Sequence, residues 1–199
     1  MAGCIILRKK VANKSELRKQ ALTQRKGLTE QQAAALSKAL LTAFKTLDFS
    51  HIFSIHVFLP ILRHNEPNTF LFIDWLQANH PEIKIVVPKA DFETHAMSHY
   101  VFNSSADLKN NHYGIPEPQN ALSFAGVPDL VLVPLLAYDQ KGYRVGYGKG
   151  FYDRFLKNIN TQKIGLSFFE PVPQINDVHL NDIRLDKCIT PNGIINFDT

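Results

Sequence analysis

A loop rich in glycine and basic residues, RVGYGKG, occupies residues 144–150. Its three glycines stand at alternate positions, and such glycines let backbone N–H groups approach an anion closely. Arg144 offers a planar fork for phosphate oxygens, and Lys149 adds a compact positive charge. Asp153 follows three residues after the loop, where a carboxylate could hold a magnesium ion that bridges phosphates. These residue types at this spacing predict a phosphate-binding site.

The flanking sequence predicts how this loop is positioned. Residues 130–136 (LVLVPLL) are apolar without interruption, as in a strand that a parallel sheet buries on both faces. Residues 139–142 (DQKG) are typical of a turn. Residues 151–156 are predicted to begin a helix, whose free N–H groups would face the same anion. The loop should therefore lie at the carboxyl end of a buried strand, where open α/β sheets bind ligands.

Spacing excludes two common phosphate-binding motifs. No Gly-x-x-x-x-Gly-Lys-[Ser/Thr] can be drawn through the loop, so it is not a P-loop. The third glycine comes one residue too early for the dinucleotide fingerprint. A glycine-rich connection without a ligand is the simpler interpretation of the glycines alone. The two cations and the carboxylate beside them favour phosphate binding.

The wider sequence around the loop resembles a long family signature. The segments 133–134 (VP) and 137–139 (AYD) precede the loop, and Phe-Tyr-Asp follows it, ending at Asp153. Together they resemble the signature of the 5-formyltetrahydrofolate cyclo-ligases, also called methenyltetrahydrofolate synthetases. The family sequence is usually Arg-Leu-Gly-x-Gly-x-Gly-Tyr-Tyr-Asp, so Val145 and Phe151 are mild departures.

The resemblance covers nearly the whole chain. Residues 14–18 (KSELR) look like the family's N-terminal helix that reaches the nucleotide, and residues 58–59 with Glu66 look like its folate-contacting segment. The C-terminal region departs from the pattern. The family's Gln after the penultimate strand and its His near the end are missing, although Asn181 is followed by Asp182, which keeps the carboxylate.

The resemblance implies a reaction and a set of residue roles. The reaction is the ATP-dependent cyclisation of 5-formyltetrahydrofolate to 5,10-methenyltetrahydrofolate, with release of ADP and phosphate through a phosphorylated formyl intermediate. ATP would be the co-substrate and Mg²⁺ the metal. The implied catalytic residues are Arg144 and Lys149; the ATP-binding residues are Lys14, Arg18, Arg144, Val145, Gly146, Tyr147, Gly148, Lys149, Gly150, Phe151 and Tyr152; the folate-binding residues are Leu59, Glu66, Tyr113 and Tyr152; the metal ligands are Asp153 and Asp182.

Composition limits the class of protein. With 199 residues, 45% of them hydrophobic, the chain can bury a substantial core, and a single domain over residues 1–199 is expected. No apolar run is long enough to span a membrane, and residues 4–7 are too few for a signal peptide, which predicts a cytoplasmic protein. Cys4 and Cys188 imply neither a disulfide framework nor a metal site. We expect a monomer.

Charge and histidine content leave two alternatives open. The net charge is +4, and basic residues crowd residues 8–26 while the remainder has a small acidic excess. A basic RNA-binding module is the non-enzyme alternative, but no aromatic residues interleave the cluster, so a nucleic-acid partner is not expected. A sugar-phosphate isomerase or transferase on a related α/β sheet is the other alternative, and it would need no ATP. His95 and His99 stand four apart, yet no Glu completes a zinc motif.

The predicted elements alternate between helix and strand. Two helices come first, and a capping box of Thr29 and Gln32 begins the second of them. A further helix should start at Pro67. Such alternation predicts one α/β domain, a three-layer αβα sandwich with a mostly parallel sheet. The expected helices are residues 15–25 and 29–47, and the expected strands are residues 52–59, 83–87, 96–102, 130–136 and 163–168, with a final hairpin in residues 188–197.

Overall fold

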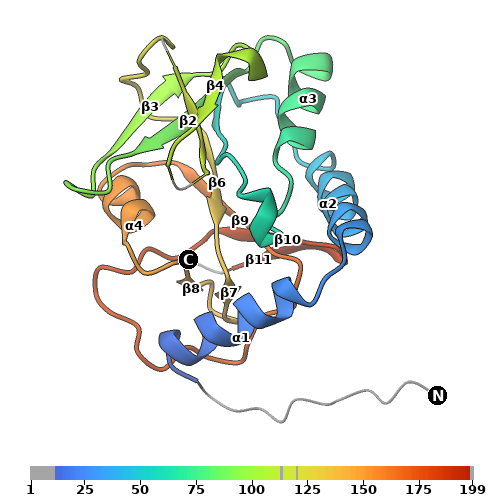
Figure 1. Cartoon of the computed structure of the whole chain (residues 1–199), viewed down its shortest axis with the longest axis vertical. Coiled ribbons are helices and arrows are strands. Elements are labelled where there is room, and N and C mark those ends of the chain that lie inside the picture. Colours follow the sequence, from blue (N-terminus) through green and yellow to red (C-terminus); the bar gives the residue numbers. More distant parts are fainter. Residues whose placement is uncertain (1–11, 113, 120, 198–199) are drawn as a thin grey trace.

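The computed structural model describes residues 12–112, 114–119 and 121–197, and its centre is one large sheet (Figure 1). Within the described residues this sheet has seven strands, in the order β11-β10-β9-β6-β1-β2-β3. The five inner strands run parallel, and the two edge strands are antiparallel to their neighbours. The strands are β1 (Ser54–His56), β2 (Lys84–Ala90), β3 (Met97–Val101), β6 (Leu130–Pro134), β9 (Gln162–Leu166), β10 (Lys187–Thr190) and β11 (Gly193–Asn196).

The order of the parallel strands reverses between β1 and β6. From β1 the chain moves outward to β2, and it later returns to β6 on the other side of β1, where Ile55 pairs with Leu130. Connections that leave adjacent strands at such a reversal diverge, and ligands of open α/β sheets bind there, beyond the carboxyl ends. The segment after β1 and the segment after β6 therefore border the same edge of the sheet.

One face of the sheet is covered by α2 (Glu30–Phe44) and α3 (Phe70–Asn79), as Figure 1 shows. Phe44 and Phe72 are fully buried and pack with Ile55 and Leu132 of the sheet. Burial of each such side chain stabilises the fold by ~1.5–3 kcal/mol. The predicted capping box is confirmed, because the Thr29 and Gln32 side chains bond each other's backbone N–H groups.

The opposite face is covered by α4 (Phe151–Leu156) and by irregular chain near the C-terminus. Val131 and Val133 of β6 face this layer, whereas Leu132 faces α2 and α3. Burial on both faces explains why the sequence of β6 is uninterrupted by polar residues. The predicted three-layer α/β fold is confirmed. Among the described residues, the layer opposite α2 and α3 contains only one short helix, α4.

The remaining helix, α1 (Lys14–Lys26), lies across the carboxyl end of the sheet. It packs on a small hairpin of β7 (Ala137–Tyr138) and β8 (Arg144–Val145), where Leu17 meets Val145. The predicted turn in residues 139–142 closes this hairpin. The sequence does not predict the hairpin itself, because strands of two residues are too short to show a pattern.

Several element boundaries differ from the predictions. Helix α3 begins at Phe70, not at Pro67. The backbone N–H of Asn68 bonds Ser37 of α2, and the Thr69 hydroxyl bonds the carbonyl of Phe58, so this segment is held in the connection. Other short elements were not expected, namely the 3₁₀ turns η1 (Leu62–His64) and η2 (Ser105–Asp107) and the hairpin of β4 (Leu108–Asn110) and β5 (Pro116–Pro118).

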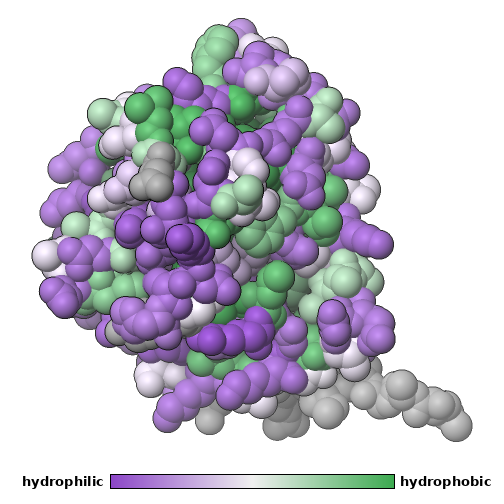
Figure 2. Space-filling model, turned by 45° about the horizontal axis from the view of Figure 1, so that its top comes forward, coloured by the Kyte–Doolittle hydropathy of each residue, from purple (hydrophilic) through white to green (hydrophobic). Residues whose placement is uncertain are grey.

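The surface in Figure 2 carries hydrophobic residues in separate patches among hydrophilic ones. Scattered exposed apolar side chains are normal for folded proteins. Within the described residues, none of the helices combines the length and the apolar character that crossing a membrane requires.

Candidate functional site

The glycine loop connects β8 to α4, and its backbone requires glycine at two positions. Gly148 and Gly150 have φ values of +90° and +68°, a region that side chains disfavour. A Cβ at Gly150 would also lie 2.9 Å from Nη1 of Arg154. At Gly146 a Cβ would meet nothing within 4 Å. The loop is thus fixed by its later glycines, while open space borders Gly146.

Arg144 is buried, and both arms of its guanidinium are bonded. Nη2 lies 2.9 Å from Oδ1 of Asp153, and Nη1 donates to the carbonyl of Ile183. The same Asp153 oxygen accepts the N–H of Ile183 at 3.2 Å. Burial lowers the pKa of Arg144, while the carboxylates of Asp153 and Asp182 oppose that shift. In this structure Arg144 therefore orients Asp153 and the C-terminal segment, and a direct phosphate contact by Arg144 stays a prediction.

The two predicted metal ligands face one hollow. Asp153 and Asp182 both line a cavity of about 390 Å³ beside Gly150 and His179. Asp182 forms an ion pair with Lys14 and accepts the N–H of His179 at 2.6 Å. No group of three metal-binding side chains occurs among the described residues. Two carboxylates suit Mg²⁺, which usually keeps several waters and completes its shell with substrate phosphates.

Two further predicted cations lie along the loop. Nε of Arg18 donates to the carbonyl of Gly146 at 2.9 Å, which ties α1 to the loop. The Lys149 side chain is exposed, and in the part of the chain that the structure describes it forms no ion pair. Lys149 is therefore the predicted phosphate ligand that is most available to a new partner.

The turn between β2 and β3 packs against the start of α4, which the sequence does not predict. The rings of Phe92 and Phe151 lie 5.4 Å apart, and Nε of Arg154 donates to the carbonyl of His95 at 3.0 Å. This contact is long-range in sequence, so no local pattern indicates it. Phe151 is consequently in contact with the turn between β2 and β3.

Glu66 lies beside the tip of the glycine loop. Its side chain is almost fully buried; Oε2 accepts the N–H of Ile61 at 2.8 Å, and Oε1 accepts the hydroxyl of Tyr147. Nη1 of Arg25 lies 3.9 Å from the same Oε1 atom. The folate residue and the nucleotide loop implied by the resemblance are thus in direct contact.

Arg25 is a site residue that the sequence analysis missed. It is buried, and its Nη2 donates to the carbonyl of Leu135, at the end of β6. Its place among the many basic residues of residues 8–26 gave no reason to single it out. The signal was nevertheless present, because Leu17, Ala21 and Arg25 recur every four residues and so share one face of the helix.

Tyr152 lies near both Glu66 and Arg144. Its hydroxyl is buried without a hydrogen-bond partner among the described residues. Burial raises the pKa of Tyr152, the nearby charge of Glu66 adds to the shift, and Arg144 opposes it. The hydroxyl is therefore a proton donor that is within electrostatic range of both Glu66 and Arg144.

The sequence analysis also missed a buried histidine, His56, whose ring lies near Tyr152. His56, on β1, is fully buried, and neither ring nitrogen has a partner among the described residues. Its ring centroid lies 5.2 Å from that of His99, 5.1 Å from Phe155 and 5.8 Å from Tyr152. Burial, reinforced by His99, holds the pKa of His56 well below its usual value. The ring is thus neutral at neutral pH.

Comparison with known proteins identifies the family. A model of the 5-formyltetrahydrofolate cyclo-ligase family matches residues 10–191. This chain belongs to that family. A relative named 5-formyltetrahydrofolate cyclo-ligase from Mycoplasma pneumoniae is 31% identical over 89% of this chain and 98% of its own length. One from Haemophilus influenzae is 33% identical over 47% of this chain and 52% of its own.

A solved structure supports the same assignment. The structure of Aquifex aeolicus 5,10-methenyltetrahydrofolate synthetase has a TM-score of 0.77 and 30% identity, over 94% of this chain and 93% of that one. Among the curated cyclo-ligase relatives, the chain spans between about half and two thirds of the length of several, with 63% for the protein from Schizosaccharomyces pombe.

Cyclo-ligase residues predicted from the sequence are partly assembled by the fold. Lys14, Arg18 and the loop gather around Asp153 and Asp182, and Glu66 joins them through Tyr147. Leu59 is 5% exposed and belongs to the core, so it has little surface to offer a ligand. Tyr113 lies outside the described residues. The monomeric state, the cytoplasmic location and the absence of a nucleic-acid partner stay predictions.

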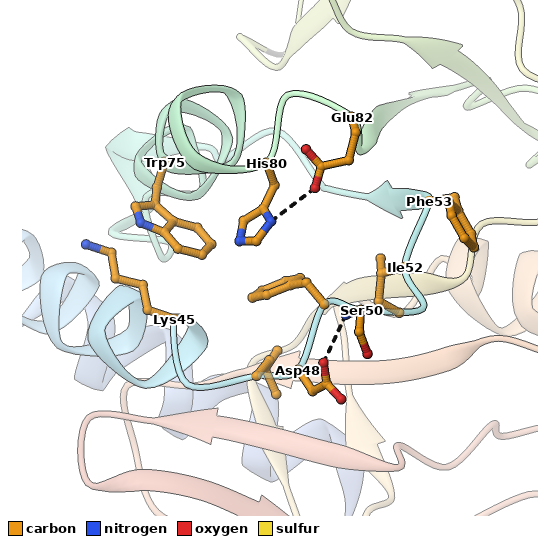
Figure 3. Close-up of a pocket in the computed structure, with 10 residues that line it drawn as sticks. Lys45, Asp48, Ser50, Ile52, Phe53, Trp75, His80 and Glu82 are labelled. Carbon is orange, nitrogen blue, oxygen red and sulfur yellow. Dashed lines mark hydrogen bonds and ion pairs between the residues drawn. The ribbon is translucent and has the colours of Figure 1, made fainter.

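A second hollow lies at the other end of the sheet (Figure 3). It has a volume of about 440 Å³, and its lining residues Phe53 and Glu82 come just before β1 and β2. Its rings and charges contact one another: His80 lies 4.8 Å from Phe49 between centroids and bonds Glu82 at 3.2 Å. We call this the aromatic hollow. It contains none of the residues implied by the family resemblance.

Proposed function

We propose that this chain catalyses the ATP-dependent conversion of 5-formyltetrahydrofolate to 5,10-methenyltetrahydrofolate, with release of ADP and phosphate. The observation that supports it most directly is the contact between the glycine loop and Glu66, through Tyr147. A cyclo-ligase must bring a nucleotide phosphate to a folate formyl group. Adjacent phosphate-binding and pterin-binding elements meet that requirement, and family membership supports the same reaction.

The nucleotide would bind along residues 146–150. Open space at Gly146 leaves room for a phosphate, and the exposed Lys149 can move to one. Lys14 and Arg18 approach from α1. Asp153 and Asp182 have suitable chemistry for Mg²⁺, which would neutralise phosphate charge when bound. Because Lys14 is paired with Asp182, we expect Lys14 to exchange that partner for a phosphate when the nucleotide and metal enter.

The folate would bind at Glu66. A carboxylate can accept two hydrogen bonds from an amino-pyrimidine edge, which fits the pterin part of folate. Tyr152 would lie beside the reacting groups, with its hydroxyl able to donate to a developing negative oxygen. Leu59 and Tyr113 keep their proposed folate contacts as predictions.

The proposed chemistry requires positioning more than a protein nucleophile. The formyl oxygen attacks the γ-phosphorus and ADP leaves; N10 then attacks the activated carbon. The C–O bond breaks, phosphate departs with the former formyl oxygen, and N10 loses its proton. Phosphoryl transfer of this kind depends on charge neutralisation and alignment. The described cysteine, Cys188, is fully buried and plays no part.

The deciding experiment follows the absorbance of methenyltetrahydrofolate. Purified protein should form it from 5-formyltetrahydrofolate only when ATP and magnesium are present, with one ADP released for each product. A sugar-phosphate isomerase or transferase would show no such ATP-dependent signal. RNA affinity that falls steeply with salt, without cyclisation, would favour the RNA-binding alternative. Failure of cyclisation by folded protein would overturn the proposed function.

A further inference from the structure

Each oxygen of the Glu66 carboxylate already accepts a hydrogen bond from the protein, and the side chain is enclosed. Oε2 is bonded to the backbone N–H of Ile61 at 2.8 Å, and Oε1 accepts from the hydroxyl of Tyr147. Arg25 approaches Oε1 to 3.9 Å. Only 5% of the residue is exposed. Because the carboxylate is so little exposed, a ligand gains access to both oxygens only by displacing one of the groups that enclose it.

Arg25 and Ile61 are fixed, because both belong to firmly held parts of the fold. Arg25 is 3% exposed and is bonded to the carbonyl of Leu135. Its own carbonyl accepts the Asn65 side chain at 2.7 Å, and the same side chain bonds Leu28 at 3.1 Å. The end of α1 and the segment before Glu66 are thereby joined. Arg25 therefore cannot withdraw without breaking its bond to Leu135, and the Ile61 donor belongs to the main chain, where the carbonyl of Ile61 also accepts the N–H of His64 at 2.8 Å.

Tyr147 is held far less firmly. It is 39% exposed and stands between Gly146 and Gly148, the second of which has a φ of +90°. Glycines on both sides allow the backbone to reorient at small cost. Among the residues that the structure describes, its hydroxyl bonds Glu66 and, at 3.5 Å, Arg25 and no other group. Tyr147 is therefore the partner that a ligand can displace.

We propose that Tyr147 is a latch on the folate site, whose hydroxyl occupies Glu66 in the free protein and is displaced by the amino-pyrimidine edge of the folate. The proposal rests on the proposed function, in which Glu66 binds folate. The exchange replaces one hydrogen bond to the carboxylate with two. Arg25 stays in place and compensates the charge of Glu66 in both states.

The chemistry of Tyr147 suits this role. Burial of the hydroxyl, with the charge of Glu66, raises the pKa of Tyr147, so the group remains a donor over the neutral range. The residue stands at a position that the family signature leaves variable, so the latch is a property of this chain. Because Tyr147 belongs to the phosphate loop, folate entry also releases the loop from Glu66.

The test is a double-mutant cycle on folate affinity. Calorimetry with 5-formyltetrahydrofolate, without nucleotide, compares the parent protein with Tyr147→Phe, Glu66→Gln and the double variant. Tyr147→Phe removes the hydroxyl that competes for Glu66, so a larger fraction of the protein has Glu66 available to folate. Folate binding should therefore tighten about fivefold to tenfold. Glu66→Gln should weaken binding. In the Glu66→Gln background, Tyr147→Phe should give no further tightening.

Tyr143→Phe is the matched control, because it removes a hydroxyl from the hairpin that precedes the glycine loop and should leave folate affinity unchanged. Tyr147→Leu removes the hydroxyl with a different side chain and should tighten binding as Tyr147→Phe does. Unchanged or weaker binding in folded Tyr147→Phe and Tyr147→Leu, with Glu66→Gln still impaired, would overturn the latch and leave the proposed function standing. Normal affinity in Glu66→Gln would overturn the latch together with the folate assignment, whereas ATP-dependent cyclisation would still test the reaction itself.

Discussion

Two hollows of similar volume lie at opposite ends of the sheet, and their linings differ in kind. The cavity beside α4 measures about 390 Å³ and the aromatic hollow about 440 Å³, so size does not distinguish them. The first collects charged groups from α4 and residues 179–182, beside the glycine loop. In the second, Lys45 lies over Trp75 and His80 bonds Glu82. The charged groups beside the glycine loop are the reason that the proposed function assigns phosphate and magnesium to the first hollow.

The strongest contrast is expected between two lysines, one near each hollow. Lys149→Ala should raise the ATP concentration needed for half-maximal rate about 10- to 100-fold, since a charge-assisted phosphate contact contributes ~1.5–3 kcal/mol. Its melting temperature should stay unchanged, because the side chain is exposed. Lys45→Met, in the aromatic hollow, should leave ATP dependence unaltered. Steady-state kinetics with both variants would decide, and normal ATP dependence in Lys149→Ala would remove the loop from the proposed site.

A carboxylate in each hollow provides the second contrast. Asp153→Asn should lower turnover sharply, with partial recovery at high magnesium, because a metal ligand loses its charge. It should also lower the free energy of unfolding by about 1–2 kcal/mol, a value reduced for solvent screening because the Asp153 side chain is 34% exposed while its partner Arg144 is buried. Asp48→Asn should change neither quantity. Full activity of Asp153→Asn at ordinary magnesium would transfer the metal role to Asp182.

The buried histidine predicts a dependence of stability on pH. Because the folded-state pKa of His56 is lowered, the unfolded chain takes up the proton first as pH falls. Stability from this group is complete above the unfolded-state pKa of about 6.5 and is lost below it. The pKa of His99, which faces His56 from β3, is lowered by burial and adds to the effect.

Denaturant titrations between pH 7 and pH 5 would measure this loss. His56→Leu should reduce the loss of unfolding free energy between pH 7 and pH 5. Phe155→Leu changes the same packing without removing a titrating group, so it should keep the full loss. Identical slopes in the parent protein and His56→Leu would show that other groups determine the acid sensitivity. His56 also contacts Tyr152 and Phe155, so a substitution at His56 changes their packing as well as removing a titrating group. The free energy of unfolding therefore reports the protonation of His56 more directly than activity does.

The smallest effect is expected in the aromatic hollow itself. Lys45→Met should lower the free energy of unfolding by about 0.5–1 kcal/mol or less, since the ammonium lies 5.7 Å from the Trp75 ring in an exposed cation–π contact. Folate and nucleotide affinities should not change. A shift in either affinity would show that the aromatic hollow communicates with the site, and the contrast between the two hollows would then fail.

Local patterns predicted the parts of this fold that are encoded locally. The apolar run of β6, the capping box at Thr29 and the C-terminal hairpin were all available from neighbouring residues. The family signature predicted residues that the fold brings to one edge of the sheet. In each case the physical cause acts within a few residues or within one continuous motif.

The parts that could not be predicted depend on pairs far apart in the chain. The bond from Tyr147 to Glu66 spans 81 positions, and the bond from Arg25 to Leu135 spans 110. Arg144 was expected to face a ligand, but its guanidinium also donates to the carbonyl of Ile183, which lies 39 positions away in the C-terminal segment. Such partners are fixed only when the sheet is assembled, so side-chain type alone does not specify them.

Helix α1 fixes the distance between side chains at the two ends of the proposed site. Lys14 and Arg18 lie at the end proposed for the nucleotide, and Arg25 lies near Glu66, the proposed folate ligand, all on one helix. At 1.5 Å per residue, positions 14 to 25 span about 16 Å, which would set the separation of the two proposed substrates in advance. One residue inserted into α1 would turn one end by about 100° relative to the other. Each half could then still hold its own ligand, but the two ligands would no longer meet.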